Sequence, residues 1–304
     1  MEFALGGAAA VCAVCFTNPL EVVKTRFQLQ GELKARGQYA VHYSNFFHAM
    51  FVIVKKDGIL ALQKGLGPAA MHQVILNGTR LGGYQVAEER GWFLNKKGQV
   101  SLLKSSVIGA SFGAVGGFLG SPLYLVKTHL QSKSDKSIAV GHQHEHLNTA
   151  TALRKIFRQF GVTGLWRGAS GAVVRIAVGS SVQLSSFSIL KEYFKMYEVF
   201  QGTKYLDTFA AGMIAGVGIA LVMAPFDLIS TRLYNQGVDA NGKGLLYKTY
   251  LECVSKTWKQ EGLHGMYKGV MPCYLRIGPH SCLSLLFWDI FKTWRRNLFP
   301  PLTD

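Results

Sequence analysis

The sequence predicts an all-α membrane protein in which six transmembrane helices form three homologous two-helix repeats. One proline-centred motif occurs as NPLEVVKTRFQ, SPLYLVKTHLQ and APFDLISTRLY, and its prolines Pro19, Pro122 and Pro225 are evenly spaced. The runs 105–126 and 208–226 contain no charged residue. Because roughly 20 apolar residues cross a bilayer, such runs are long enough to span it. A motif that recurs inside the chain also argues against a cleaved signal peptide as the source of the first apolar run.

Glycines repeat in register with the prolines. One set follows the motif at Gly65, Gly168 and Gly269. The predicted repeats cover residues 1–98, 99–200 and 201–304. Their apolar segments predict helices near 2–30, 66–92, 101–131, 170–195, 204–234 and 270–296. Because proline removes a helical hydrogen bond, each motif proline should kink its helix. Three equal units around one axis predict a pseudo-threefold barrel with a central cavity.

The chain is strongly basic, with a net charge of +16, which raises the alternative of a nucleic-acid-binding protein. The basic residues are spread over loops, however, and form no single stripe. The long loops 31–64, 132–167 and 235–268 are the more basic ones, which is typical of loops that stay on the inner side of a membrane. We therefore expect no nucleic-acid partner, and we place both termini opposite these loops. A basic membrane surface also suits anionic lipids.

Cysteines and histidines give no strong indication of redox or metal chemistry. Cys12 and Cys15 form a CxxC pattern, but within a run of small residues, where burial is the simpler interpretation. The segment GHQHEH at 141–146 has histidines at alternate positions, and we favour a polar loop over a metal site because no fourth ligand is evident nearby. The sequence has no catalytic triad, Walker loop or dinucleotide fingerprint. It therefore predicts neither an enzyme nor a cofactor.

Charged residues follow the first motif proline at helical spacing. Glu21 and Lys24 are three residues apart and so share one helix face. The equivalent positions in the other copies hold Tyr124, Lys127, Asp227 and Ser230. Three copies around an axis bring these side chains into a ring at one end of the cavity. Because charges at membrane depth are tolerated when paired, we predict a gate of interhelical ion pairs. Snorkelling to the interface would explain a lone lysine, but not repeated acid and base.

The motif resembles the signature of the mitochondrial carrier family, solute carrier family 25, which reads Pro-x-[Asp/Glu]-x-x-[Lys/Arg]-x-[Lys/Arg]-x-Gln and occurs three times. PLEVVKTRFQ matches it throughout, PLYLVKTHLQ lacks the acid, and PFDLISTRLY lacks the first base and the glutamine. FTNPLEVVKTR, AVGHQH, STRLYNQ and YLRIGPH are similar to the branch containing members 34 and 35, related to oxaloacetate and dicarboxylate carriers. The resemblance implies a monomeric, multi-pass protein of the mitochondrial inner membrane. It also implies both termini toward the intermembrane space and cardiolipin among the bound lipids.

The resemblance further implies which gate residues pair. The implied partners on the matrix side are Glu21 with Lys127, Asp227 with Lys24, and Tyr124 with Ser230, of which the last pair is uncharged. Losing both charges of one pair avoids leaving a buried charge alone. The residues expected to brace these pairs are Gln28, Gln131 and Tyr234. A weaker gate at the intermembrane end is implied for Asp289, Lys292 and Lys191.

Internal alignment of the repeats predicts the substrate site. Two layers of aligned positions are His72, Arg175 and Arg276, then Arg80, Gln183 and Ser284. The family's substrate contacts fall in the first layer. Guanidinium groups match carboxylate and sulfate oxygens in bidentate geometry, so a small dianion is the natural ligand. We predict antiport of dicarboxylates and inorganic oxoanions (oxaloacetate, malate-like acids, sulfate, thiosulfate or phosphate) by alternating access. A nucleotide or coenzyme carrier is the alternative. His72 is expected to make transport pH-sensitive.

Overall fold

The computed structural model describes residues 2–35, 37–94, 101–146, 148–195 and 204–298. Within these ranges the chain forms helices joined by loops and has no strand, and Val238 and Gly244 form an isolated bridge. The long helices are α1 (Glu2–Leu29), α3 (Leu66–Glu89), α4 (Leu102–Leu119), α7 (Ala169–Lys195), α8 (Lys204–Asn235) and α10 (Val270–Leu298). The all-α class is confirmed, and most of these bounds lie within a few residues of those predicted.

The predicted helix 101–131 is divided into two helices. After Gly120 the chain continues as α5 (Ser121–Ser132), bent by 64° from α4. Pro122 lies in the first turn of α5, where proline is tolerated because the backbone N–H has no acceptor within the helix. Pro19 and Pro225 instead lie inside the continuous helices α1 and α8. The second motif therefore bends the chain by starting a new helix.

Each of the three long loops contains a short helix that the sequence prediction missed. These helices are α2 (Phe46–Asp57), α6 (Thr149–Leu165) and α9 (Tyr250–Met266). The side chains of Asn45, Asn148 and Thr249 accept hydrogen bonds from their first turns. Such caps satisfy backbone N–H groups that have no partner within the helix. Each repeat thus contributes a short helix between its long ones.

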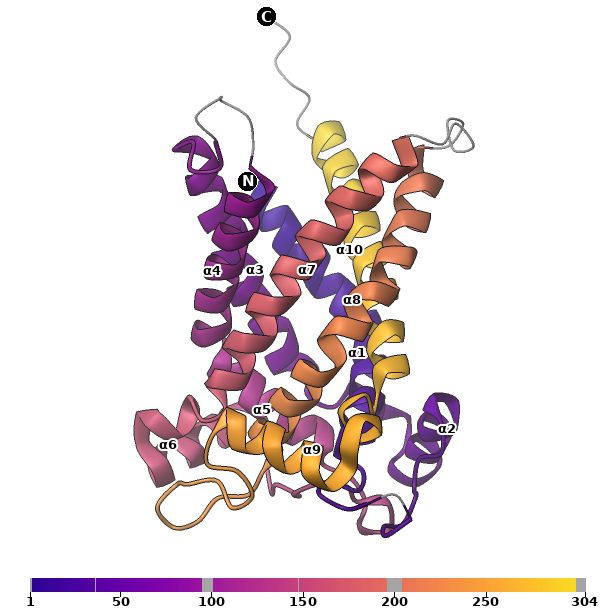
Figure 1. Cartoon of the computed structure of the whole chain (residues 1–304), viewed down its shortest axis with the longest axis vertical. Coiled ribbons are helices and arrows are strands. Elements are labelled where there is room, and N and C mark those ends of the chain that lie inside the picture. Colours follow the sequence, from indigo (N-terminus) through magenta and orange to yellow (C-terminus); the bar gives the residue numbers. More distant parts are fainter. Residues whose placement is uncertain (1, 36, 95–100, 147, 196–203, 299–304) are drawn as a thin grey trace, which may run out of the picture.

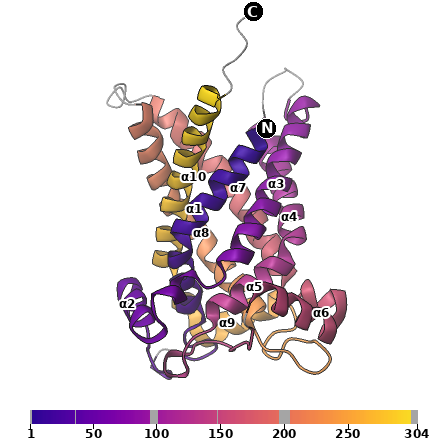
Figure 2. The ribbon, with the colours of Figure 1, turned by 180° about the vertical axis from the view of Figure 1, so that it is seen from behind.

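The long helices form a closed ring. Contacts between neighbours run from α1 through α3, α4, α7, α8 and α10 back to α1. The helices converge at the end that carries α2, α6 and α9, here called the converged end, and spread apart toward the opposite end (Figures 1 and 2). Close packing of α4 on α7 depends on a glycine, because a Cβ on Gly113 would lie 2.8 Å from Ser180 Oγ.

Three apolar clusters fill the converged end, and each packs a motif helix against the short helix that follows it. The first cluster includes Leu29 and Phe46, the second Leu130 and Ile156, and the third Leu233 and Cys253. Away from this end the long helices expose apolar side chains, such as Leu103 on α4 at 76% exposure. An exposed apolar surface of this kind is typical of a helix that faces lipid.

The candidate membrane spans in the described part of the chain lie on helices that carry the motif. Gly7–Leu29 and Gly216–Asn235 are long and apolar enough to cross a membrane, with hydropathies of 1.2 and 1.4. The bent pair of α4 and α5 adds a third candidate if it is counted as one span. The helices α3, α7 and α10 carry the predicted substrate residues, which lowers their apolar content.

Candidate functional site

Two buried ion pairs join the motif helices at the converged end. Lys24 Nζ on α1 lies 2.6 Å from Asp227 Oδ2 on α8. Lys127 Nζ on α5 lies 2.6 Å from Glu21 Oε1 on α1. These are two of the pairings that the sequence implied, and the four side chains are only 1% to 12% exposed. Because loss of one partner would leave a buried charge alone, the pairs hold the ends of these three helices together.

Of the three predicted braces, Gln28 alone is hydrogen-bonded to an ion pair in the described structure. Gln28 Nε2 donates to Asp227 Oδ2 at 2.9 Å. Gln131 Nε2 donates instead to Asn18 Oδ1 at 3.1 Å, so it links α5 to α1 beside the gate. The Tyr234 hydroxyl shares a hydrogen bond with the Ser121 hydroxyl at 2.8 Å. The latter two therefore brace helix against helix.

Tyr124, which replaces the gate acid of the second repeat, presents its ring to two cations. Lys127 Nζ lies 4.9 Å and Arg175 Cζ 4.8 Å from the ring centroid. A cation over an aromatic face is attracted by the ring quadrupole. Ser230 Oγ donates to Gly171 O on α7 at 2.6 Å, and no described contact joins it to Tyr124. The third gate partnership thus remains a prediction, while the ring has a polar role of its own.

The predicted substrate residues Arg175 and Arg276 lie next to the ion pairs. Arg175 is 8% exposed, and its Nη1 lies 3.9 Å from Asp227 Oδ1. Arg276 interacts electrostatically with both Glu21 and Asp227. The Nε atoms of both arginines and Nε2 of His72 are buried without a hydrogen-bond partner. Because buried polar groups are normally partnered, a ligand with several acceptor oxygens would complete this arrangement.

The other predicted residues are less informative. Ser284 Oγ is buried without a hydrogen-bond partner, and Arg80 lies partly exposed on α3. The ring of His72 packs 5.2 Å from that of Tyr124, and its role in pH dependence stays a prediction. The side chains that lie outside the described residues are those of Gln183, Lys191, Asp289 and Lys292.

His280 belongs to this region and was not assigned by the sequence prediction. Its Nδ1 lies 3.2 Å from Thr17 Oγ1 on α1, and its Nε2 lies 3.1 Å from Gln73 Nε2 on α3. It follows Arg276 by one helical turn on α10, so the two side chains share a face. That spacing was visible in the sequence. It places Arg276 on the same face of α10 as His280, which makes polar contacts with α1 and α3.

A second missed feature is a charged anchor for the short helices. Arg26 Nη1 lies 2.7 Å from Asp57 Oδ2 at the end of α2. Arg232 binds Glu261 on α9 in a bidentate manner, at 2.6 and 2.8 Å. Both arginines occupy the second basic position of the motif, and both acids precede a glycine. In the second repeat the corresponding residues are His129 and Phe160, so the repeat lacks this ion pair.

The fold and the site together define a class of protein. A ring of long helices, with exposed apolar surfaces, is held closed at one end by buried ion pairs, and arginines with unpartnered nitrogens lie beside them. These are features of a helical membrane transporter built from repeats.

Comparison with known proteins makes this class specific. The family profile described as Mitochondrial carrier protein matches residues 1–92, 98–198 and 201–298. The chain is 50% identical to solute carrier family 25 member 35 of Mus musculus, over 97% of this chain and 98% of that protein. It is 40% identical to a mitochondrial oxaloacetate transport protein of Saccharomyces cerevisiae, over 95% and 87%. It is also 40% identical to mitochondrial citrate transporter E of Aspergillus niger, over 93% and 89%. The chain belongs to the mitochondrial carrier family.

Proposed function

We propose that the protein is an antiporter that exchanges small dicarboxylates and inorganic oxoanions across the mitochondrial inner membrane. The observation that carries this proposal is the set of unpartnered buried nitrogens on His72, Arg175 and Arg276. These residues come from α3, α7 and α10, one from each predicted repeat. Guanidinium groups bind carboxylate and sulfate oxygens as forks. The printed names of two relatives, an oxaloacetate transport protein and a citrate transporter, support a carboxylate substrate.

In this proposal the ring comprises six spans arranged with pseudo-threefold symmetry around a central cavity. The spans are α1, α3, the bent pair of α4 and α5, α7, α8 and α10. The basic loops and the converged end lie on the matrix side, and both termini face the intermembrane space. Apolar side chains exposed on the long helices support contact with lipid, and the basic loops support anionic headgroups such as cardiolipin. The protein works as a monomer.

In this proposal the ion pairs form the matrix gate, and the gate is closed when both pairs are made. A dianion bound to Arg175 and Arg276 competes with Asp227 and Glu21 for the same guanidinium groups. That competition weakens the network that keeps the matrix end closed. Because a ligand shifts an equilibrium only by its differential affinity for the two states, this competition is the source of coupling between binding and opening. No covalent step is involved.

Exchange measured in liposomes tests this proposal. The purified protein is reconstituted with internal oxaloacetate, malate, sulfate, thiosulfate, phosphate, ADP or coenzyme A. Small dianions should support exchange, whereas nucleotide-only exchange would favour the alternative carrier. Arg175→Ala and Arg276→Ala each remove charge-assisted hydrogen bonds of about 1.5–3 kcal/mol, so exchange should fall roughly 10- to 100-fold. Arg154→Ala, on the exposed side of α6, is the matched control. Normal rates and half-saturation in both arginine variants would eliminate the site.

A further inference from the structure

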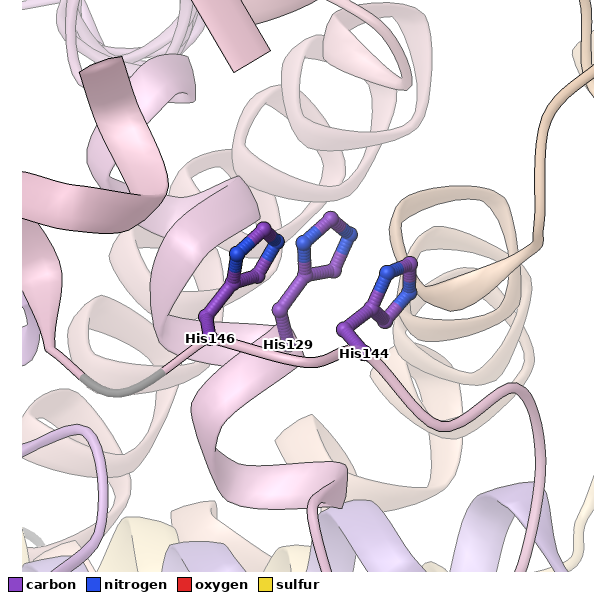
Figure 3. Close-up of side chains that lie close together, drawn as sticks. All are labelled: His129, His144 and His146. Atoms are coloured by element: carbon purple, nitrogen blue, oxygen red, sulfur yellow. The ribbon is translucent and has the colours of Figure 1, made fainter. Parts of the chain in front are cut away.

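Three histidines lie together at the converged end, although one of them is distant from the other two in the sequence. His129 lies on α5, and His144 and His146 lie in the loop before α6 (Figure 3). One ring nitrogen from each comes within 4.8 Å of the others. The rings are nearly parallel, with centroids 3.4 Å apart for His129 and His144 and 5.5 Å apart for His129 and His146. The sequence prediction favoured a polar loop here because no fourth ligand was evident nearby, and it considered only the histidines of the segment 141–146.

Two backbone carbonyls determine which nitrogens are free to bind a ligand. His129 Nε2 lies 2.9 Å from Tyr234 O, and His144 Nε2 lies 3.0 Å from Asn235 O. A carbonyl oxygen only accepts, so both Nε2 atoms carry the hydrogen and both Nδ1 atoms carry the lone pair. His129 Nδ1 is buried and has no hydrogen-bond partner. Donation of the other ring nitrogen to a carbonyl is the usual arrangement of a metal-ligating histidine.

We propose that His129, His144 and His146 bind one Zn²⁺-like transition-metal ion and that the ion ties α5 to the loop before α6. In the first and third repeats, Arg26 and Arg232 make the corresponding tie through an ion pair. The second repeat has no such pair, because its arginine is replaced by His129. A bound ion would restore a strong link at the same level of the fold.

The loop imidazoles are suited to this role. His146 is buried and His144 is half-buried, so both rings are partly shielded from water. Neutral imidazole nitrogens bind Zn²⁺ at about 2.0–2.1 Å, which requires the three nitrogens to approach to roughly 3.3 Å. In the proposal, the loop that carries His144 and His146 moves toward His129 when the ion binds. Lys133, Lys155 and Arg167 add positive charge nearby, so we expect an anionic fourth ligand such as hydroxide or chloride.

Metal binding by the full-length protein tests the proposal. The carrier is purified with a tag that contains no histidine, treated with a chelator and titrated with Zn²⁺. The wild-type protein should bind one ion per chain, and the ion should raise the unfolding temperature. The His144→Asn/His146→Asn double variant should bind at least tenfold more weakly and lose this thermal shift. The matched control is His42→Asn/His48→Asn, in the equivalent loop of the first repeat.

Co²⁺ provides a second readout, because its absorption spectrum reports tetrahedral nitrogen ligation directly. Wild type and the control should give the same spectrum, and the double variant should not. A wild-type protein that binds no more Zn²⁺ than the double variant would overturn the proposal, as would equal loss in the control. These measurements require no transport, so their outcome is independent of the proposed substrate.

Discussion

The second repeat differs from the first and third at two levels of the converged end. In the first and third repeats, Arg26 and Arg232 hold carboxylates from the short helices. The second repeat has His129 and Phe160 at these positions. At the level of the proposed gate, the acid of the other repeats is replaced by Tyr124. Two positions that hold acids in the first and third repeats therefore hold aromatic residues in the second repeat.

The difference teaches that, at the anchor of the short helix, the second repeat has lost the arginine together with its acid. A buried charge that remains without its partner would destabilise the fold, whereas removal of both charges of the pair leaves room for another contact. Tyr124 presents its ring to Lys127 and Arg175, and His129 stacks on His144. In the second repeat, aromatic rings thus occupy the two positions that hold acids in the other repeats, while Lys127 still pairs with Glu21. The following predictions test this contrast.

The largest effect is expected from removing Asp227. Asp227→Ala leaves Lys24 buried without its carboxylate and removes the acceptor of Gln28. The loss should be about 3–5 kcal/mol, measured as a lower unfolding midpoint in detergent. The Lys24→Ala/Asp227→Ala double variant removes both charges and should recover part of the loss. Identical unfolding of the single and double variants would show that this pair does not hold α1 to α8.

The anchors of the short helices should differ in strength between repeats. Arg232→Ala breaks the bidentate pair with Glu261 and should cost about 3 kcal/mol. In chelator-treated protein, His129→Ala removes one neutral hydrogen bond to Tyr234 O and should cost about 1 kcal/mol. The same unfolding measurement compares them. Equal losses of stability in the two variants would contradict the conclusion that the second repeat attaches its short helix in a different way.

A double-mutant cycle tests whether Tyr124 and Ser230 are facing gate positions. Tyr124→Asp with Ser230→Lys should introduce a third ion pair and stabilise the closed matrix end. The two changes should be non-additive by roughly 0.5–3 kcal/mol. The measurement is the labelling, from the matrix side, of a cysteine placed in the cavity of an otherwise cysteine-free protein. Additivity within error would mean that the threefold pairing scheme does not extend to this pair.

The ring of Tyr124 should stabilise the gate through its face and not through its hydroxyl. Tyr124→Leu removes the attraction to Lys127 and Arg175, which is worth about 0.5–2 kcal/mol, and should increase matrix-side labelling of the same cysteine. Tyr124→Phe keeps the ring and should label like wild type. If Phe and Leu have equal effects, cation–π contact is not the stabilising interaction.

The smallest effects concern two equivalent loop acids whose pKa values move in opposite directions. Burial raises the pKa of Glu32 in the first repeat from its ordinary 4.5 to about 7. Hydrogen bonds from Ser137 lower the pKa of Asp135 in the second repeat. A raised carboxyl pKa destabilises the fold as the pH rises through this window, because the unfolded chain ionises first. A lowered carboxyl pKa, as at Asp135, stabilises the fold above pH 3.8, the ordinary pKa of this group, and that stability is lost as the pH falls.

Substitution of these two acids should therefore change stability with opposite sign. Glu32→Gln should stabilise the protein on the order of 1 kcal/mol at pH 8, and the gain should vanish near pH 4. Asp135→Asn should destabilise it slightly at neutral pH. Unfolding midpoints measured from pH 4 to pH 8 check both. A pH-independent effect of Glu32→Gln would show that its carboxyl titrates normally in the folded protein.

The long helices and two ion pairs could be predicted because they depend on register within the repeats. Apolar segments of membrane length mark the helices, and acid and base at a fixed helical offset meet when three copies surround one axis. The short helices were missed, although Asn45, Asn148 and Thr249 are residues typical of helix caps. The break at Gly120 was missed because a proline within an apolar run is equally compatible with a kinked, continuous helix.

By itself the sequence determined the repeated motif and the all-α class, and its resemblance to the family implied the pairing of Lys24 with Asp227 and of Lys127 with Glu21. The tertiary structure alone decided that Tyr124 faces two cations and that His129 meets the loop histidines. The physical reason is that periodicity in a sequence predicts contacts of helices but not contacts of irregular loops. Helical spacing defines which side chains share a face of a helix. Contacts between a helix and an irregular loop depend on the path of the folded chain, and no periodic sequence pattern predicts that path.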